Sequence, residues 1–304
     1  MAILAGCAAM SHAPQLLTQP EDWKKMPART KRHLLIPPDI EQRLTDAAVK
    51  DNFDRCHLAI GQLRNTIASW RCDAIIVLGD DQHENFFEDN MPAFAVYIED
   101  QVRVTRKFSF YGENPIDQSV TYPVRKDLAF DLLTKLMATG FDPAWCKKTR
   151  YEGGLGHAFG RVLHLVQAEA KTPILPLMVN TYFPPAPSAA RCIQLGKSLR
   201  TIIESWPDTM RIGVLASGGL THTRLDEDLD AQIIRALETY DEVYLSSLPA
   251  DELIEGTSEI RNWIIAAAIA GGPATMVDYI PCYRTPDGAG CGMGFAHWGL
   301  NKDR

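Results

Sequence analysis

The stretch AIIVLGDDQHE, residues 74–84, joins an unbroken apolar run to a glycine and five polar side chains. A run of strand length without apolar–polar alternation indicates a strand buried on both faces. Similar runs recur at 3–9, 94–98, 174–179 and 212–216. Stretches with helical periodicity accompany them, at 53–70, 124–138, 158–168, 189–206, 227–237 and 259–270. This pattern predicts an α/β fold, with a mixed, largely buried sheet flanked by helices.

The sequence shows no sign of a boundary between domains. No fixed-period repeat and no low-complexity linker divides the 304 residues, so we expect one domain over residues 1–304. Residues 18–39 carry Pro20, Pro27, Pro37 and Pro38 among many charges. Prolines at this density disfavour a regular helix or strand, and this segment is expected to form a surface cap or lid.

The composition argues against several classes of partner. The net charge is −7 and no long block of Lys or Arg occurs, so we expect no nucleic acid partner. The apolar start MAILAGCAAM lacks a basic flank and is too short to span a bilayer, so we interpret it as a buried strand and expect no membrane association. Seven cysteines are dispersed without a CxxC pair, which is typical of reduced thiols in a cytoplasmic protein.

Four of the eight histidines share one sequence context. His12, His83, His157 and His222 each closely follow an apolar run or a glycine pair, in AAMSH, GDDQH, GGLGH and SGGLTH. Packing does not require histidine at these points, whereas the loops beyond strand ends are where α/β proteins bind ligands. We therefore expect a functional site that contains these histidines.

The residue types favour a metal site. Imidazole binds Fe, Zn, Cu or Ni, and two histidines with one carboxylate form the site of non-haem Fe(II) oxygen enzymes. Glu259, at the start of a predicted helix, is one candidate carboxylate, and Asp80, Asp81 and Glu84 compete with it. Zinc hydrolases accept similar sets, although the helical HExxH pattern is absent from the sequence. Spacing alone does not choose the metal.

Five motifs resemble one enzyme family. They are SHAP at 11–14, GDDQHENFFEDNMPAF at 79–94, GLGHAF at 155–160, SGGLTH at 217–222 and GTSEIRNW at 256–263. They occur in the order seen in class III extradiol ring-cleavage dioxygenases, the relatives of the protocatechuate 4,5-dioxygenase catalytic subunit. The resemblance extends over residues 3–298 and implies a single catalytic domain. It is closer to single-chain members such as 2,3-dihydroxyphenylpropionate and 3-O-methylgallate dioxygenases.

The resemblance implies a role for each motif. His12 and Glu259 match ligands of Fe(II), and His222 matches the general base. His157 matches a second active-site histidine that acts as an acid or positions the substrate. The implied reaction opens the ring of a small aromatic diol with O2, and homo-oligomers are common among family members.

The second histidine ligand of the family is uncertain in this sequence. In the family it directly follows an Asp, about ten residues before the Pro of a Pro-x-Phe strand. Counting back from Pro92 places Gln82 at that position and His83 one residue later. Imidazole chemistry favours His83 and the register favours Gln82, so both remain candidates for one ligand.

The motifs indicate the substrate-binding residues less directly than they indicate the metal ligands. Asp81, Thr221 and Tyr279 lie near the motifs and are our candidates for this role. Two other functions use the same residues: a zinc-dependent hydrolase or lyase with metal-bound water as nucleophile, and a non-catalytic relative that retains only the fold.

Overall fold

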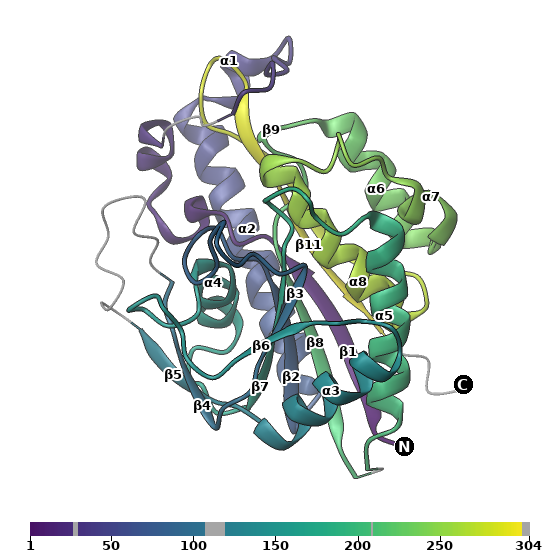
Figure 1. Cartoon of the computed structure of the whole chain (residues 1–304). Coiled ribbons are helices and arrows are strands. Elements are labelled where there is room, and N and C mark those ends of the chain that lie inside the picture. Colours follow the sequence, from purple (N-terminus) through teal and green to yellow (C-terminus); the bar gives the residue numbers. More distant parts are fainter. Residues whose placement is uncertain (27–29, 107–118, 208, 300–304) are drawn as a thin grey trace.

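The structure, a computed structural model, describes residues 1–26, 30–106, 119–207 and 209–299. Within these residues a nine-stranded sheet has the order β10-β11-β1-β8-β2-β7-β3-β6, with β9 beside β11 (Figure 1). A separate hairpin pairs β4 (Gln101–Val104) with β5 (Val120–Pro123). The strands of the large sheet are β1 (Ile3–Met10), β2 (Ala74–Gly79), β3 (Phe94–Tyr97), β6 (Ala144–Cys146), β7 (Ile174–Val179), β8 (Arg211–Ser217), β9 (His222–Arg224), β10 (Thr275–Tyr283) and β11 (Ala289–Trp298).

Helices cover both faces of the sheet. Helices α3, α5 and α8 pack on one face, and α2 and α4 pack on the other (Figure 1). No helix in the described ranges is long and apolar enough to cross a membrane. The helices are α1 (Ile40–Arg43), α2 (Asp46–Ser69), α3 (Lys126–Ala138), α4 (His157–Val166), α5 (Ala189–Glu204), α6 (Glu227–Thr239), α7 (Glu242–Ser247) and α8 (Ile260–Ala270).

The burial of strand β2 on both faces explains why its sequence is apolar at every position. Ala74, Ile76 and Leu78 contribute to the core beneath α3, α5 and α8, whereas Ile75 and Val77 contribute to the core beneath α2 and α4. Alternate side chains of a strand point to opposite faces, so a strand covered on both faces is apolar at every position. The predicted α/β fold, a mixed and largely buried sheet flanked by helices, is confirmed.

The register of the central strands assembles one polar edge. Strands β1, β8, β2 and β7 are parallel neighbours, with β11 antiparallel to β1 and β3 antiparallel to β7. Met10 of β1 pairs with Ser217 of β8, and Leu78 of β2 pairs with Ala216. The carboxyl ends of these strands are therefore level, and the loops that follow them meet at one edge.

Every predicted strand and helix is present, although some ends shift. Helix α2 begins at Asp46 rather than 53, because the Thr45 side chain accepts the Ala48 N–H and caps an earlier turn. The sequence did not predict the hairpin of β10 and β11, since glycines at 290, 292 and 294 are unfavourable inside a strand. Gly292 makes room for a neighbour: a Cβ there would lie 2.2 Å from Asp230 Oδ2.

The 3-10 turn η1 (Pro14–Leu17) precedes the proline-rich segment 18–39. Within that segment, residues Pro20–Lys25 form a second 3-10 turn, η2, which contacts α2. Trp23 is buried, and its indole N–H donates to the carbonyl of Gln15 at 3.0 Å. Pro27 lies outside the described residues. The role of residues 18–39 as a cap or lid stays a prediction.

Candidate metal centre

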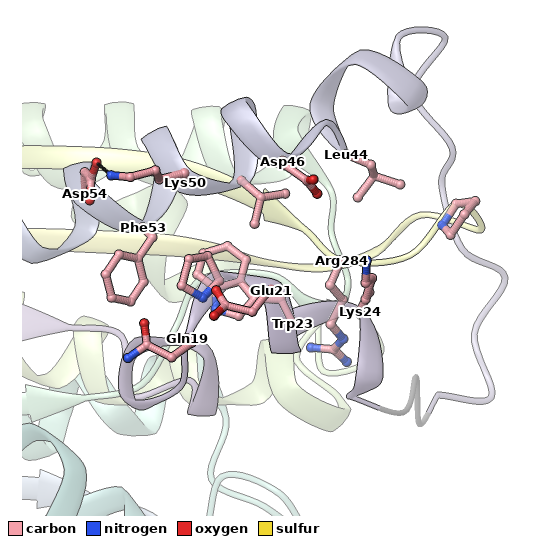
Figure 2. A pocket seen from close by; sticks show the side chains of 13 residues that line it. Gln19, Glu21, Trp23, Lys24, Leu44, Asp46, Lys50, Phe53, Asp54 and Arg284 are labelled. Carbon is pink, nitrogen blue, oxygen red and sulfur yellow. Dashed lines mark hydrogen bonds and ion pairs between the residues drawn. The ribbon is translucent and has the colours of Figure 1, made fainter.

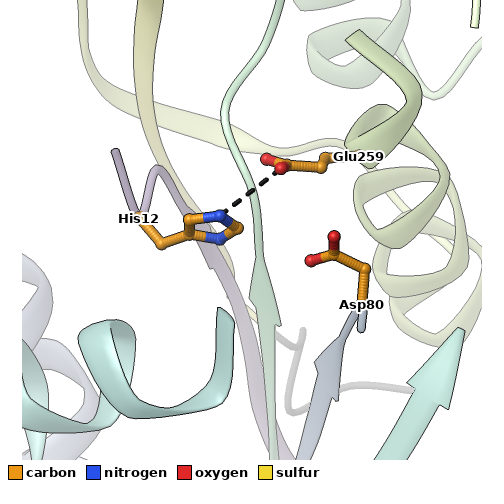
Figure 3. A group of neighbouring side chains, drawn as sticks. All are labelled: His12, Asp80 and Glu259. Atoms are coloured by element: carbon orange, nitrogen blue, oxygen red, sulfur yellow. Dashed lines mark ion pairs between the residues drawn. The ribbon is translucent and has the colours of Figure 1, made fainter. Parts of the chain in front are cut away.

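Three buried side chains converge at the carboxyl ends of the parallel strands. His12 follows β1, Asp80 follows β2, and Glu259 ends the 3-10 turn η4 (Glu255–Glu259) that leads into α8. One ligand atom from each lies within 4.8 Å of the others, and Figure 3 shows the three side chains turned toward one another. Their exposed fractions are 4%, 1% and 1%.

The tautomer of His12 follows from its hydrogen bond to Ser217. The Ser217 hydroxyl donates to the carbonyl of Ala158, so it can only accept from His12 Nδ1, which lies 2.9 Å away. In the tautomer that has its proton on Nδ1, the lone pair of His12 is on Nε2. That nitrogen lies 3.4 Å from Glu259 Oε1. His12 therefore presents its ligand atom to the cluster.

Glu259 uses both carboxylate oxygens. Oε2 accepts the N–H of Gly219 at 3.0 Å and lies 3.5 Å from His222 Nε2, whereas Oε1 faces His12. Burial alone would raise the pKa of Glu259, but His12 and His222, when protonated, outweigh burial and hold the pKa of Glu259 well below its ordinary value. Gly218, at φ +143°, leaves room for this side chain, because an added Cβ would lie 2.6 Å from Glu259 Cβ.

Asp80 and Gln82 form the third side of the cluster. Gln82 Nε2 donates to Asp80 Oδ2 at 3.0 Å and to Glu259 Oε1 at 3.3 Å. Asp80 Oδ1 is buried and has no hydrogen-bond partner in the described part of the chain. Burial, with a smaller contribution from Glu259, raises the pKa of Asp80 to about 6.

His83 lies apart from this cluster. Its backbone has φ 63°, and its ring stacks on Phe183 with 3.8 Å between ring centroids. His83 Nε2 lies 3.3 Å from Glu88 Oε1, and the side chain is 29% exposed. Of the two candidates for the uncertain ligand, Gln82 thus reaches His12's cluster, and the structure does not bring His83 into it.

His222 stands beside the cluster with a defined orientation. Its Nδ1 donates to the carbonyl of Leu220 at 2.9 Å, so Nε2 faces Glu259. Burial would lower the pKa of His222, but the Glu259 carboxylate and the Leu220 carbonyl outweigh it and raise the pKa. Gly256 allows the close approach, because a Cβ there would lie 2.1 Å from His222 Cδ2.

His157 begins α4 and pairs with Glu84. Glu84 Oε1 lies 3.0 Å from His157 Nδ1 and accepts the backbone N–H of His157 at 2.8 Å. The His157 ring meets the His12 ring edge-on, with 5.1 Å between centroids. Burial, then the charges of Arg161 and His12, hold the pKa of His157 well below its ordinary value, and burial raises the pKa of Glu84 to about 7.

The three predicted substrate contacts have protein partners. Asp81 accepts backbone N–H groups from Glu84, Asn85 and Phe86, and so it shapes its own loop. The Thr221 hydroxyl and the Tyr279 hydroxyl both donate to Asp230 Oδ2, at 2.9 Å and 2.6 Å. These contacts give all three residues a role in holding the site together.

A divalent metal ion fits the cluster of His12, Asp80 and Glu259. Bonds of about 2.1 Å to nitrogen and oxygen place neighbouring ligands about 3 Å apart and opposite ligands about 4 Å apart. His12 Nε2 and Glu259 Oε1 are 3.4 Å apart, and the ligand atom of Asp80 lies within 4.8 Å of those of His12 and Glu259. The lone pair on His12 Nε2 and the Asp80 Oδ1 atom, which has no hydrogen-bond partner among the described residues, could both bind a cation. Among the described residues this is the one such group of His, Cys, Asp or Glu.

A pocket of about 740 Å³ lies between η2 and α2 (Figure 2). Trp23 and Phe53 supply aromatic walls. The charges in the lining are mixed: Lys24, Lys50 and Arg284 are positive, and Glu21, Asp46 and Asp54 are negative. Arg284 is largely buried, and its positive charge partly opposes the rise in the pKa of His222, so Arg284 acts electrostatically on the candidate site. The pocket thus shares one residue with the surroundings of His222.

The sequence did not indicate two residues that organise the site. Ser217 orients His12, and its position in the SGGLTH motif was an available signal. Asp230 accepts the N–H of Thr221 at 2.8 Å in addition to the two hydroxyls. It lies inside α6 among other acidic residues, and no local pattern distinguishes it from a solvated helix face.

Curated proteins with similar sequences are named as dioxygenases. One is a 2,3-dihydroxyphenylpropionate/2,3-dihydroxicinnamic acid 1,2-dioxygenase of Photorhabdus laumondii, 26% identical over 162 residues, which are 53% of this chain and 46% of that protein. Another is a gallate dioxygenase of Pseudomonas putida, 29% identical over 143 residues, 43% of this chain and 41% of that protein. The chain spans about half the length of the curated relatives it matches.

Structural and family comparisons extend over nearly the whole chain. The crystal structure of an uncharacterized protein of Escherichia coli K12 superposes with a TM-score of 0.52 at 14% identity, and covers 97% of this chain and 99% of that chain. This similarity concerns the fold alone. The family model for the catalytic LigB subunit of aromatic ring-opening dioxygenase matches residues 6–288. The chain therefore belongs to the LigB family of aromatic ring-opening dioxygenase catalytic subunits.

Proposed function

We propose that this protein is an Fe(II)-dependent extradiol dioxygenase that opens the ring of a small catecholic substrate with O2. The observation that carries the proposal is the placement of Glu259, which faces His12 through one oxygen and His222 through the other. A carboxylate between a candidate metal site and a histidine suits a reaction in which the histidine takes a proton from a substrate hydroxyl.

A bound metal ion supplies Lewis acidity toward the diol and the redox chemistry with O2. His222 takes the proton of the substrate hydroxyl at Nε2, because Nδ1 is committed to the Leu220 carbonyl. Its raised pKa favours the protonated product of this step. The side chain is 20% exposed, which gives the proton a route to solvent.

His157 and Glu84 form the second proton-transfer pair of this proposal. His157 is held neutral by its low pKa, and Glu84, with a pKa of about 7, carries a proton part of the time at neutral pH. A proton that moves from Glu84 to His157 Nδ1 allows the other ring nitrogen to deliver one to the substrate. Gly156 permits the pairing, because a Cβ there would lie 1.7 Å from Glu84 Oε2.

An acidic substituent on the substrate ring is part of the proposal. The curated relatives are named for 2,3-dihydroxyphenylpropionate and gallate, which both carry a carboxylate. Arg284, largely buried and within electrostatic reach of His222, supplies a guanidinium for such a group. Asp81, Thr221 and Tyr279 support the surrounding loops in this proposal.

The remaining parts of the proposal concern the whole chain. We take residues 1–304 as a single catalytic domain of a cytoplasmic homo-oligomer, in which residues 18–39 act as a cap. The family resemblance supports the homo-oligomer. The contact of η2 with α2, and the residues of η2 that line the pocket with Arg284, support the cap.

Oxygen uptake with metal analysis tests the proposal. Protein loaded anaerobically with Fe(II) should consume O2 when a catechol is added, and protein loaded with Zn(II) should not. The matched control substrate is the corresponding monophenol, which lacks the second hydroxyl. Iron-loaded protein that consumes no O2 with any diol, yet hydrolyses an ester or amide when loaded with zinc, would establish the hydrolase instead.

A further inference from the structure

We infer that Asp80, rather than Gln82 or His83, provides the third protein ligand of the metal, so that the site has one imidazole and two carboxylates. The inference rests on the proposed metal site at His12 and Glu259 but not on the reaction carried out there. It replaces the expected third ligand, Gln82 or His83, with a carboxylate, so the donor set carries one more negative charge.

Gln82 is placed to donate hydrogen bonds to the two carboxylate ligands rather than to bind the metal. Its Nε2 faces Asp80 Oδ2 at 3.0 Å and Glu259 Oε1 at 3.3 Å. Both neighbours are carboxylate oxygens, which can only accept, so the amide presents its N–H donors to the cluster. An amide N–H group is not a metal ligand. Gln82 therefore fixes the two carboxylates relative to each other.

His83 is held away from the cluster by aromatic packing. Its ring is nearly parallel to those of Phe183 and Phe87, with centroid distances of 3.8 Å and 5.5 Å. Its Nε2 lies beside Glu88. To reach His12 and Glu259 the residue would have to leave both rings and change its left-handed backbone.

Asp80 has an oxygen available for a cation. Its carboxylate is turned toward His12 and Glu259 (Figure 3), and its ligand atom is within 4.8 Å of theirs. Asp80 Oδ1 is buried without a partner among the described residues, which is costly for a carboxylate unless something positive binds there. Asp80, with His12 and Glu259, would hold a divalent ion, whose charge would remove that cost.

The donor set determines which ions are preferred. Carboxylate oxygen is a harder donor than imidazole and suits Mn(II), whereas imidazole suits Zn(II) and Cu(II). A site with one imidazole and two carboxylates should therefore hold Mn(II) better, relative to Zn(II), than a site with two imidazoles. The substitution Gln82→His adds an imidazole at the position that the family register assigns to a ligand.

Calorimetric or EPR titration of the metal-free protein with Mn(II) tests the inference without any measurement of activity. Asp80→Asn should weaken Mn(II) binding by about 100-fold or more, beyond the 10- to 100-fold typical of residues that only orient ligands. Gln82→Ala should fall within about that 10- to 100-fold range. His83→Ala, and Asp89→Asn as an exposed control in the same loop, should bind like the unmodified protein.

Metal preference is the second measurement. Gln82→His should raise the affinity for Zn(II) relative to Mn(II) compared with the unmodified protein. The inference is overturned if Asp80→Asn binds Mn(II) normally, or if Gln82→Ala or His83→Ala loses more affinity than Asp80→Asn. Circular dichroism of each variant shows whether it is folded. Normal metal binding that depends on Asp80, together with no oxygen uptake, would sink the proposed reaction but leave this inference standing.

Discussion

The imidazole of His222 meets the carboxylate of Glu259, with 3.5 Å between Nε2 and Oε2. Because Nδ1 of His222 donates to the Leu220 carbonyl, the nitrogen that faces Glu259 is the one that gains and loses a proton. The other oxygen of Glu259 faces His12 at 3.4 Å. One glutamate thus joins the proposed metal site to the proposed base.

Replacement of His222 should separate proton transfer from metal binding. We expect His222→Gln to lower kcat by about 10²- to 10⁴-fold, the usual contribution of a general base. Metal content should be retained, because His222 is outside the group formed by His12, Asp80 and Glu259. Turnover of a catechol and bound metal are measured on the same preparation. Equal loss of metal from His222→Gln and Glu259→Gln would contradict the division of roles.

Removal of the Ser217 hydroxyl should weaken metal binding from a distance. Ser217→Ala leaves His12 Nδ1 without its acceptor, so the ring is less well oriented. We expect the Kd for metal to rise by about 10- to 100-fold. Ser205→Ala, which removes a hydroxyl from the end of α5, is the control and should not change the Kd. Identical metal affinity in the two variants would show that the hydrogen bond to His12 is unimportant.

Metal affinity should depend on pH through Asp80. Burial raises the pKa of this carboxyl to about 6, and metal binds the deprotonated form. Affinity contributed by Asp80 is therefore present above pH 6 and is lost by about tenfold per pH unit below it. Competition with a chelator of known pH dependence measures this from pH 5 to 8. At pH 5, below the pKa of this carboxyl, Asp80→Asn should release about one proton fewer than the unmodified protein on binding, and an unchanged proton count at that pH would contradict the assignment.

The buried Asp230 should stabilise both the fold and the loop that carries His222. Asn can place only one accepting oxygen where Asp230 accepts from the Thr221 N–H, the Thr221 hydroxyl and Tyr279. We expect Asp230→Asn to reduce the free energy of unfolding by about 1–3 kcal/mol and to lower kcat. Urea unfolding and kinetics measure the two effects. Asp228→Asn, exposed on the same helix, is the control, and a variant at 230 that behaves like it would refute this role.

Much of the fold could be predicted because burial leaves a direct trace in the sequence. The run at 74–78 is apolar at every position since helices cover both faces of β2. Strand β11 could not be predicted, because its glycines serve contacts with distant residues such as Asp230 and Trp263 rather than strand propensity. Such contacts between distant parts of the chain are invisible to a local pattern.

The residues of the candidate site could be predicted in part from their positions at the ends of elements. The structure brings His12, His157, His222 and Glu259 to one edge of the sheet. The choice between Gln82 and His83 depends on the backbone of one loop, where the left-handed conformation of His83 turns its ring onto Phe183. The periodicity of apolar residues in the sequence does not indicate a left-handed conformation at a single residue.

Incorporation of isotopically labelled O2 into product tests the central claim most directly. Iron-loaded protein, given a catechol with a carboxylate substituent, should yield a ring-opened product that contains both atoms of one labelled O2 molecule. The product of Glu259→Gln under the same conditions should be absent. A product that takes its new oxygen from labelled water alone, or an O2 consumption that leaves the ring intact, would contradict the assignment of this chain as a ring-opening dioxygenase.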